Sequence, residues 1–445
     1  MSQSPLPLYG EASLKVEPYG VEPVPAVERH GRPGGQFTLW LGSNLTIADF
    51  ALGFFPVSLG LSWPWTIASL AIGNLLGGLA LASCTVMGPE LGLPQLMISR
   101  RLFGRIGGLA PALLNYISTI GWFSVNNILG SFGLQILFPH FAFWQAAAVL
   151  VVIQGLLAVF GHNLIHAYER IISIILGLLF AVVSVLVLRS PSLHRYHPIL
   201  HSPPWVSFAL VVAAALSYLG SWAPYASDYS RYLPPSTERR HLLRASFWGG
   251  FLGSLWLELV GVGVAIAAGV QATNPIVALH QVAGPFATLA VGAIILGGTA
   301  ADALNLYSNA LAAGALRIRL PRWSLAILAS GLGLTLSLLG SGAFEQYYDN
   351  FLLLLGYWLT PWLGVMLADF YRRRVLVQRD SPPAIDKAAS LSFLVGLGVS
   401  VPFMSSTLYT GPIAQALHGA DLTFYVGFVV SASMYWLLSR PRKIA

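Results

Sequence analysis

Charged residues are scarce in this sequence. Asp, Glu, Lys and Arg make up 9% of the 445 residues, whereas hydrophobic residues make up 56%. A soluble domain usually carries about 25% charged residues. The composition is typical of an integral membrane protein, and no polar insertion between the apolar segments is long enough to form a soluble enzyme domain.

Cysteine is nearly absent as well. Cys84 is the only one, and a single thiol forms neither an intrachain disulfide nor a cysteine-based metal site. The motifs HExxH and CxxC are missing, and the histidines fall mostly in loops or near the ends of apolar segments. We therefore expect no metal site, no bound cofactor and no enzymatic activity.

What the chain does contain is a series of long apolar segments. We predict twelve, at residues 36–60, 65–87, 108–137, 141–160, 166–188, 206–225, 245–268, 285–311, 322–340, 350–371, 387–407 and 421–439. A helix needs roughly 20 residues to cross a hydrocarbon core of about 30 Å. Helices also satisfy their own backbone groups in lipid. The sequence therefore predicts an all-α integral membrane protein with twelve transmembrane helices over residues 36–440.

Basic residues are distributed unevenly between the two sides of these segments. With the loops assigned alternately, all 24 Lys and Arg residues except Arg189 and Arg195 fall on the side of the N-terminal segment. The positive-inside rule places that side in the cytoplasm. We predict a multi-pass protein of the plasma (inner) membrane whose two terminal segments, 1–35 and 441–445, are cytoplasmic tails. Residues 1–35 contain no apolar run typical of a signal peptide, so we expect a mobile tail there.

The basic residues sit in separate short loops and form no single face, which argues against a nucleic-acid partner. The lipid bilayer is the only macroscopic partner that the composition requires, and no protein partner is inferred.

Two segments contain residues that interrupt a helix. The first carries Asn44 and Asp49 at mid-depth, and the sixth carries Gly220, Ser221 and Pro224. Proline removes a backbone donor, and irregular backbone at membrane depth is tolerated where it lines protein or a watery cavity. Interrupted helices five segments apart predict two inverted repeats of five helices with a ligand site between them. Ordinary proline kinks are the alternative.

Three acids lie within the apolar segments: Asp49, Glu258 and Asp302. Each costs about 2.5–3.5 kcal/mol at a helix centre on insertion scales. Asp302 shares a helical face with Asn305 and Asn309, and Asp49 lies in the expected interruption, so these two are candidate functional groups. Glu258 could instead have a structural role, as a buried acid that is hydrogen-bonded to neighbouring helices, and this alternative stays open.

Two tryptophans lie at the middle of predicted spans, although tryptophan prefers the headgroup region. They are Trp122, which shares a face with Asn126, and Trp222. Indoles from two repeats could sandwich a flat ring, while amide side chains read its edge. The alternative is that both indoles only pack against other helices.

Five motifs together are specific, although each alone is weak. They are GPELGLPQLMISRRLFG (88–104), GWF (121–123), GHNLIHAYER (161–170), WAPYASDYSRYLP (222–234) and NLYS (305–308). In this combination the chain resembles the nucleobase–cation symporter family, particularly its purine-cytosine permease branch.

The resemblance implies a five-plus-five inverted repeat with two extra C-terminal helices. The first repeat would cover about residues 36–188, the second about 206–371, and the extra helices about 387–439. It also implies a substrate-binding site. A planar heterocycle would lie between Trp122 and Trp222, contacted by Asn126, Asn305 and Ser221, with Asp49 close by.

One departure from the family concerns the coupling ion. Sodium-coupled members carry adjacent hydroxyl residues where this chain has Ala300 and Ala301, and alanine offers no oxygen to a hard cation. Asp302 or Asp49 could carry a proton instead.

The resemblance therefore implies a secondary active symporter that imports cytosine or a purine across the plasma membrane by alternating access, with H+ as the coupling ion. The alternatives are Na+ coupling, another N-heterocycle such as allantoin, a hydantoin or a vitamin pyrimidine, a passive channel, and, in a different class, a membrane-embedded enzyme.

Overall fold

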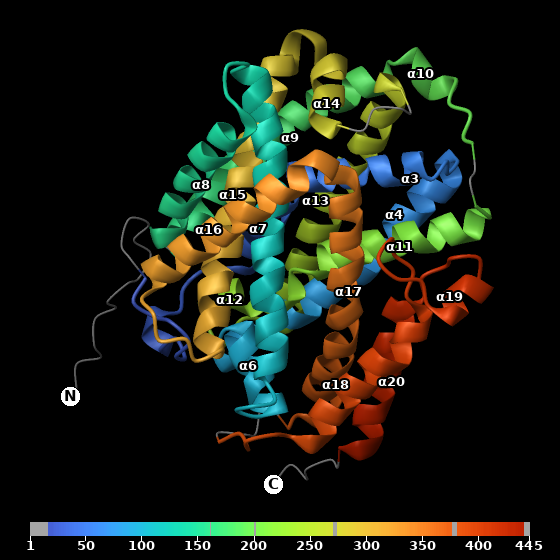
Figure 1. Ribbon diagram of the computed structural model, residues 1–445. Coiled ribbons are helices and arrows are strands. Elements are labelled where there is room, and N and C mark those ends of the chain that lie inside the picture. The colour runs from blue at the N-terminus through green and yellow to red at the C-terminus, as the bar shows by residue number, and fades with distance from the viewer. Residues whose placement is uncertain (1–16, 161, 200–201, 270–273, 376–380, 440–445) are drawn as a thin grey trace.

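The computed structural model describes residues 17–160, 162–199, 202–269, 274–375 and 381–439, and every regular element in these ranges is a helix (Figure 1). The main helices are α1 (Pro33–Asn44), α4 (Trp63–Thr85), α7 (Leu109–Leu137), α8 (Phe143–Phe160), α9 (His162–Leu188), α11 (Pro204–Gly220), α13 (Arg239–Ala268), α15 (Ala287–Ala315), α16 (Arg322–Gly340), α17 (Phe344–Ala368), α18 (Lys387–Ser400) and α20 (Thr423–Leu438). Shorter helices are α2 (Ile47–Leu52), α3 (Phe54–Ser58), α5 (Met87–Leu91), α6 (Gln95–Phe103), α10 (Pro191–His194), α12 (Ala226–Ser230), α14 (Pro275–Ala283) and α19 (Pro412–Ala416).

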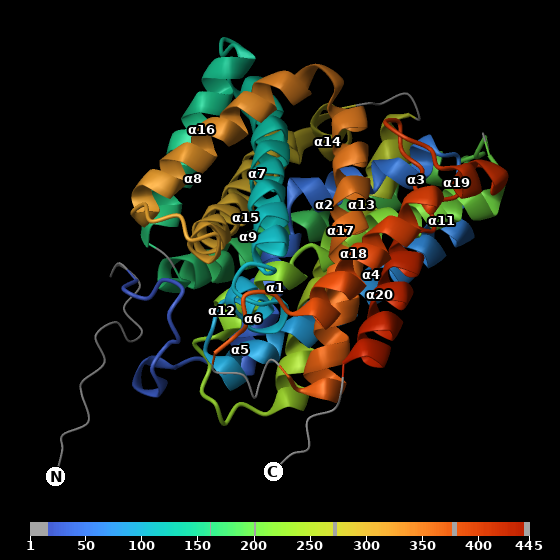
Figure 2. The same cartoon turned by 60° about the horizontal axis from the view of Figure 1, so that its bottom comes forward.

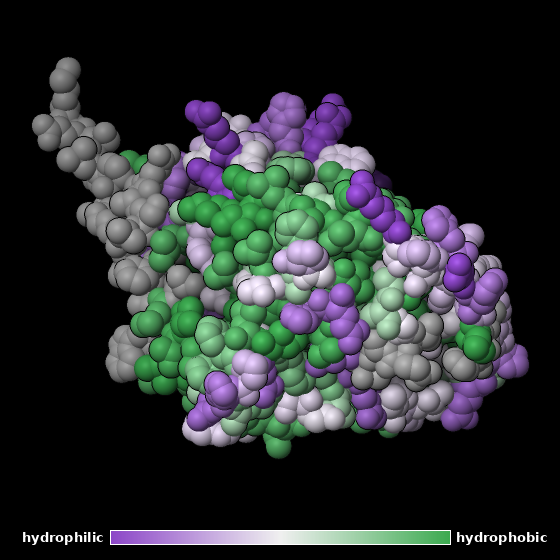
Figure 3. Space-filling view, turned by 90° about the horizontal axis from the view of Figure 1, so that it is seen from above, coloured by the Kyte–Doolittle hydropathy of each residue, from purple (hydrophilic) through white to green (hydrophobic). Residues whose placement is uncertain are grey.

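The outer surface of the bundle is apolar. Leu178 on α9, Leu339 on α16 and Leu437 on α20 are 69%, 76% and 74% exposed, and a broad hydrophobic area covers the middle of the face in Figure 3. Soluble monomers rarely expose apolar patches of this extent. Within the described residues, six helical stretches are long and apolar enough to span a membrane, and four shorter apolar helices accompany them. Four of the six stretches join consecutive helices: α4 with α5, α11 with α12, α14 with α15, and α16 with α17. The count of twelve spans therefore stays a prediction.

Loops that the sequence assigned to one side lie together. At the end of the bundle near α6, the Asp386 amide donates to the Phe103 carbonyl (2.8 Å) and the Val24 amide donates to the Gly92 carbonyl (2.9 Å). At the opposite end, near α14 in Figure 1, the Thr407 hydroxyl donates to Asn350 (2.9 Å). We call the first of these the α6 end.

Both expected helix interruptions are present. α1 ends at Asn44, and Thr46 is extended (φ −119°, ψ 164°) before α2 begins. α11 ends at Gly220, and the chain passes through Ser221 and a short 3-10 turn before α12. Asp49 lies in the first turn of α2, just beyond the break rather than within it, because Thr46 is the residue that caps α2.

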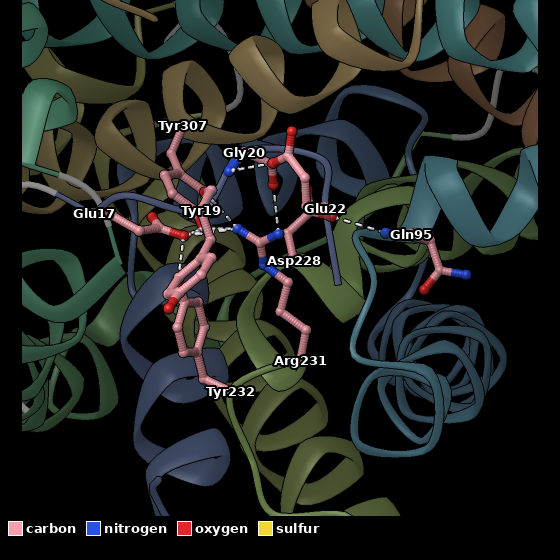
Figure 4. A network of polar contacts seen from close by, with 9 residues as sticks. All are labelled: Glu17, Tyr19, Gly20, Glu22, Gln95, Asp228, Arg231, Tyr232 and Tyr307. Atoms are coloured by element: carbon pink, nitrogen blue, oxygen red, sulfur yellow. Dashed lines mark hydrogen bonds and ion pairs between the residues drawn. The ribbon is translucent and has the colours of Figure 1, made fainter. Parts of the chain in front are cut away.

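The N-terminal segment is fixed from Glu17 onward, which corrects the expectation of a mobile tail for this part; residues 1–16 lie outside the described residues. The buried guanidinium of Arg231 contacts the Glu17 carboxylate (2.7 Å), which also accepts from the hydroxyls of Tyr232 (2.5 Å) and Tyr307 (3.1 Å). Figure 4 shows these side chains converging from the N-terminal segment, from the chain just after α12 and from α15. Burial alone lowers the pKa of Arg231, but Tyr307 and Glu17 outweigh it and raise that pKa, so the guanidinium stays charged.

The motif at 88–104 forms α5 and α6, two helices that hydropathy did not predict. In Figure 2 they lie beside α12. The side-chain oxygen of Gln95 accepts from the hydroxyl of Ser227 (2.7 Å). The backbone N–H of Gln95 donates to the carboxylate of Asp228 (2.9 Å). A Cβ added at Gly88 would lie 2.1 Å from the Ser230 hydroxyl and 2.8 Å from the backbone, so only glycine fits there. Two motifs that are far apart in the sequence therefore bind each other at the α6 end.

Candidate substrate site

Three of the residues predicted to form the site meet at one carboxyl group. Asp302 Oδ1 on α15 accepts from the side-chain amides of Asn126 on α7 (3.1 Å) and Asn305 on α15 (3.5 Å). The Tyr225 hydroxyl, next to the break after α11, donates to Asn305 Oδ1 (3.2 Å). All four side chains are buried. This chain of hydrogen bonds connects α7, α15 and the break after α11 at the core of the bundle.

Trp122 lies one helical turn before Asn126. The Asn126 amide also donates to the Trp122 carbonyl (3.2 Å). The indole makes edge contacts with Tyr218 (centroids 5.0 Å apart) and Phe351 (5.1 Å), and with Tyr348 at 6.4 Å. Aromatic side chains of α11 and α17 therefore surround an indole that is only 5% exposed.

Trp222 is not among the rings that contact Trp122; it packs within a neighbouring aromatic group. Its indole N–H donates to Asn44 Oδ1 (3.0 Å), and its ring packs on Trp40 (5.6 Å) and Tyr225 (5.3 Å). Tyr218, one turn before Trp222, is the span-6 ring that touches Trp122. The sandwich of the two indoles stays a prediction.

Ser221 lies at the break after α11, and among the described residues it makes no hydrogen bond to Asp302, Asn126 or Asn305. Its Oγ donates to the Tyr218 carbonyl (2.7 Å), which closes the last turn of α11 at the break.

Three buried polar atoms at this site have no hydrogen-bond partner among the described residues: Trp122 Nε1, Asn126 Oδ1 and Asp302 Oδ2. Buried polar atoms in folded proteins are nearly always hydrogen-bonded. One turn before Asp302, position 298 is glycine, and an added Cβ would stay 3.7 Å or more from its nearest neighbours, Ile47 and Asn126. The site thus offers hydrogen-bonding groups to a small polar ligand, and glycine at position 298 places no side chain between Ile47 and Asn126.

Asp49 lies in a second acidic group. The Ser254 hydroxyl donates to Asp49 Oδ1 (2.6 Å) and lies 3.3 Å from Glu258 Oε1, while the Asn74 amide donates to Glu258 Oε2 (2.5 Å). No hydrogen bond within the described residues joins this group to Asp302. The carboxyl of Glu258 thus has partners from α4 and α13.

The position expected for sodium lies where the break of span 1 meets α15. A Cβ at Gly297 would be 2.9 Å from the Leu45 carbonyl oxygen. On the next turn Ala300 and Ala301 are buried and offer only methyl groups, and the Thr299 hydroxyl donates to its own helix at the Ile295 carbonyl (2.8 Å). In the part of the chain that the structure describes, no group of three or more His, Cys, Asp or Glu side chains is arranged to hold a metal ion.

A cavity of about 630 Å³ opens near the α6 end. Its lining includes Gln36, Asn163, His166, Arg170 and Tyr229. The ring of Trp40 lies between this cavity and the site, because it contacts Tyr229 on one side (5.7 Å) and Trp222 on the other (5.6 Å).

Sequence reasoning missed three aromatic residues of this region: Tyr218, Tyr225 and Trp40. A signal existed for the first two, because they lie four residues before and three residues after Trp222. For Trp40 none existed, because a tryptophan near the start of a span is the usual interfacial residue.

The sequence matches the family model described as permease for cytosine/purines, uracil, thiamine, allantoin over residues 23–427. Among curated proteins it is similar to YxlA of Bacillus subtilis, with 28% identity over 96% of this chain and 97% of the relative. It is also similar to the purine-cytosine permease fcyB of Emericella nidulans, with 26% identity over 97% of this chain and 90% of the relative.

Among solved structures the fold is similar to Mhp1, described as a nucleobase-cation-symport-1 family transporter, in a closed conformation with bromovinylhydantoin bound. The TM-score is 0.77 at 18% identity, over 95% of this chain and 94% of Mhp1. The resemblance found in the sequence motifs is thus confirmed, and the fold is that of a helical membrane transporter. The chain belongs to the family of permeases for cytosine/purines, uracil, thiamine and allantoin.

Proposed function

We propose that this protein is a secondary active symporter that imports a nucleobase, cytosine or a purine, into the cytoplasm. The observation that carries the proposal is the Asp302 group. Because both Asn126 and Asn305 donate to Asp302, and Tyr225 donates to Asn305, the amide of Asn126 is oriented with its oxygen free to accept. An exocyclic amino group of cytosine or adenine is a suitable donor for that oxygen.

The ring of the base would lie against Trp122. In the conformation seen here the edges of Tyr218 and Phe351 occupy the space beside that indole, so a base enters as these side chains move aside. Trp222, Asn44 and Ser221 would complete the site from the two interrupted helices, and the indole sandwich would form on closure around the base. The similarity to fcyB, a purine-cytosine permease, supports this substrate class.

We further propose coupling to H+ rather than Na+. The side chains at Ala300 and Ala301 provide no oxygen beside the Leu45 carbonyl, and Asp302 supplies an ionisable group within the site. Asp302 is the first candidate proton carrier and Asp49 the second.

Alternating access would use twelve spans in a five-plus-five inverted repeat, with two extra C-terminal helices. The likeness to the Mhp1 fold and the paired interruptions of spans 1 and 6 support this arrangement. We place the α6 end, and both termini, on the cytoplasmic side of the plasma membrane.

Uptake into proteoliposomes of labelled cytosine, adenine, uracil and allantoin, with the proton and sodium gradients varied separately, tests these proposals. We expect accumulation of cytosine or adenine that follows an inward proton gradient, collapses with a protonophore and is unchanged when choline replaces sodium. Asp302→Asn should flatten the dependence on external pH. Sodium dependence would contradict proton coupling, and preferential uptake of allantoin would contradict the substrate assignment.

A further inference from the structure

Glu169 is an acid that neither the fold nor the substrate site accounts for. It lies on α9, only 1% of the residue is exposed, and neither carboxyl oxygen has a hydrogen-bond partner among the described residues. The other buried acids described above are held by amides or hydroxyls. A buried acid without partners is costly and is a candidate functional group by default.

The carboxyl group is covered by α1. A Cβ added at Gly42 would lie 2.6 Å from Glu169 Oε2 and 3.2 Å from Ser173 Cβ, so the backbone of α1 rests directly on this side chain. Gly42 is two residues before Asn44, which accepts from Trp222, and three before the break at Leu45. A movement of this part of α1 would therefore uncover Glu169. The same movement would shift Asn44, the hydrogen-bond partner of Trp222.

Residues that neighbour Glu169 along α9 line the cavity near the α6 end. His166 and Arg170, which lie three residues before and one residue after Glu169 on α9, line the cavity, and so does Gln36 of α1. Withdrawal of α1 from Glu169 would extend the cavity to this carboxyl.

Among the side chains that the structure describes, no charged group is bonded to the Glu169 carboxyl. α1 and α8 carry no titratable side chain. The titratable residues of the other helices against α9 are Asp302 and Tyr307 of α15, His280 of α14, and Arg239, Arg240, His241, Arg244 and Glu258 of α13; on α9 itself they are His162, His166, Tyr168 and Arg170. Within the described residues none of them forms a hydrogen bond or ion pair with the Glu169 carboxyl. Removing an ion from water costs several kcal/mol without such partners, so the carboxyl is neutral while α1 covers it.

We infer that Glu169 is the group that releases the coupled proton to the cytoplasm. With α1 in place the carboxyl holds its proton. When α1 moves away, the O–H bond breaks, the proton passes to water in the cavity, and the carboxylate that remains opposes the return of α1. Proton binding and the seating of α1 thereby favour each other, as linkage requires. The inference rests on the proton coupling proposed above.

The test compares two assays on Glu169→Gln in proteoliposomes with labelled cytosine. Glutamine has the shape of the protonated acid, so α1 should cycle without a proton. We expect exchange of labelled for unlabelled cytosine to stay within about twofold of the wild type, while accumulation driven by the proton gradient falls to the equilibrium ratio. Ser173→Ala keeps the Cβ next to Gly42, removes only a hydroxyl that donates to the Arg170 carbonyl (3.0 Å), and changes no charge, so it should preserve both.

The inference would be overturned if the Glu169→Gln variant accumulated cytosine as the wild type does. It would also be overturned if the folded variant lost exchange and accumulation equally. If the Gln variant does not fold, Glu169→Asp is tested instead. This variant should keep coupled uptake, but the pH dependence of its uptake should be displaced from that of the wild type. An unchanged pH dependence would contradict the inference. A wild-type protein that ignores the proton gradient would instead refute the proposed coupling itself.

Discussion

Asp302 fixes the direction of two amide side chains with a single oxygen atom. Since Asn126 and Asn305 both donate to Asp302 Oδ1, each amide has its nitrogen turned toward the carboxyl and its oxygen turned away. The Asn305 oxygen is taken by Tyr225, whereas the Asn126 oxygen is free to accept. The pattern of donors and acceptors that a substrate meets therefore depends on these few contacts.

We predict that Asn126→Ala changes the order of preference among bases. Cytosine and adenine carry an exocyclic amino group and should lose roughly 2- to 10-fold more affinity than uracil, from a net hydrogen bond of about 0.5–1.5 kcal/mol. Competition against labelled cytosine measures this. Asn127→Ala is the matched control, because Asn127 donates to Ala147 of α8 (3.1 Å) and not to the site. A uniform loss for every base would assign Asn126 a structural role.

Trp122→Ala should lower the affinity for every base. Stacking on an aromatic ring is worth about 1–3 kcal/mol, which corresponds to a fall of roughly one to two decades. Trp222→Ala should have the same effect if the sandwich forms. Equilibrium binding of labelled cytosine to purified protein is the measurement. Trp144→Ala, at a position 60% exposed on α8, should bind normally; unchanged affinity in both site variants would contradict the sandwich.

At the scale of helices, the motif at 88–104 connects several helices at the α6 end of the bundle. Gly88 lets α5 approach α12, and Gly104 has a positive φ (98°) where α6 ends against the chain at Ala384. The Glu90 carboxylate binds Arg239 (2.5 Å) and Arg374. The described contacts of this motif thus join helices to one another.

Gly88→Ala should destabilise the protein. The added methyl group meets backbone atoms that cannot move aside, and overpacking of this kind costs about 1–3 kcal/mol. Thermal unfolding in detergent should show a lower midpoint. The control is Gly331→Ala on α16, where nothing lies within 4 Å of the new Cβ; it should be neutral or slightly stabilising, since alanine favours a helix by about 1 kcal/mol over glycine. Equal midpoints for the two variants would refute this role of Gly88.

The sequence predicted the interruptions of α1 and α11 because glycine, proline and polar residues at membrane depth are a local signal. It placed Asn126, Asp302 and Asn305 correctly on inward faces, because helical spacing is also local. It could not show that Tyr218 rather than Trp222 touches Trp122, or that Glu169 lies under Gly42, because such contacts depend on how helices cross. Helices α5 and α6 were missed because their burial comes from docking, not from length or hydropathy.

For the whole molecule, the loops that carry most of the positive charge meet at the α6 end, and this end should face the cytoplasm. In a Cys84→Ser background, a cysteine at Arg372 should resist an impermeant thiol reagent in intact cells. A cysteine at Ala343, at the opposite end, should react. Both positions are exposed, so access to the reagent is the only difference. The reverse labelling would overturn the orientation.

The contacts of Glu17 also constrain the order in which the protein is assembled. Its partners Arg231 and Tyr307 are 214 and 290 residues further along the chain, so the ribosome makes Glu17 long before it makes them. Glu17 can therefore meet Arg231 and Tyr232 first, and its full set of contacts is complete only after Tyr307 has been translated. The complete docking of this segment requires that α15 has been inserted. In nascent chains arrested before Tyr307, the segment should therefore be accessible to proteases and quality-control factors.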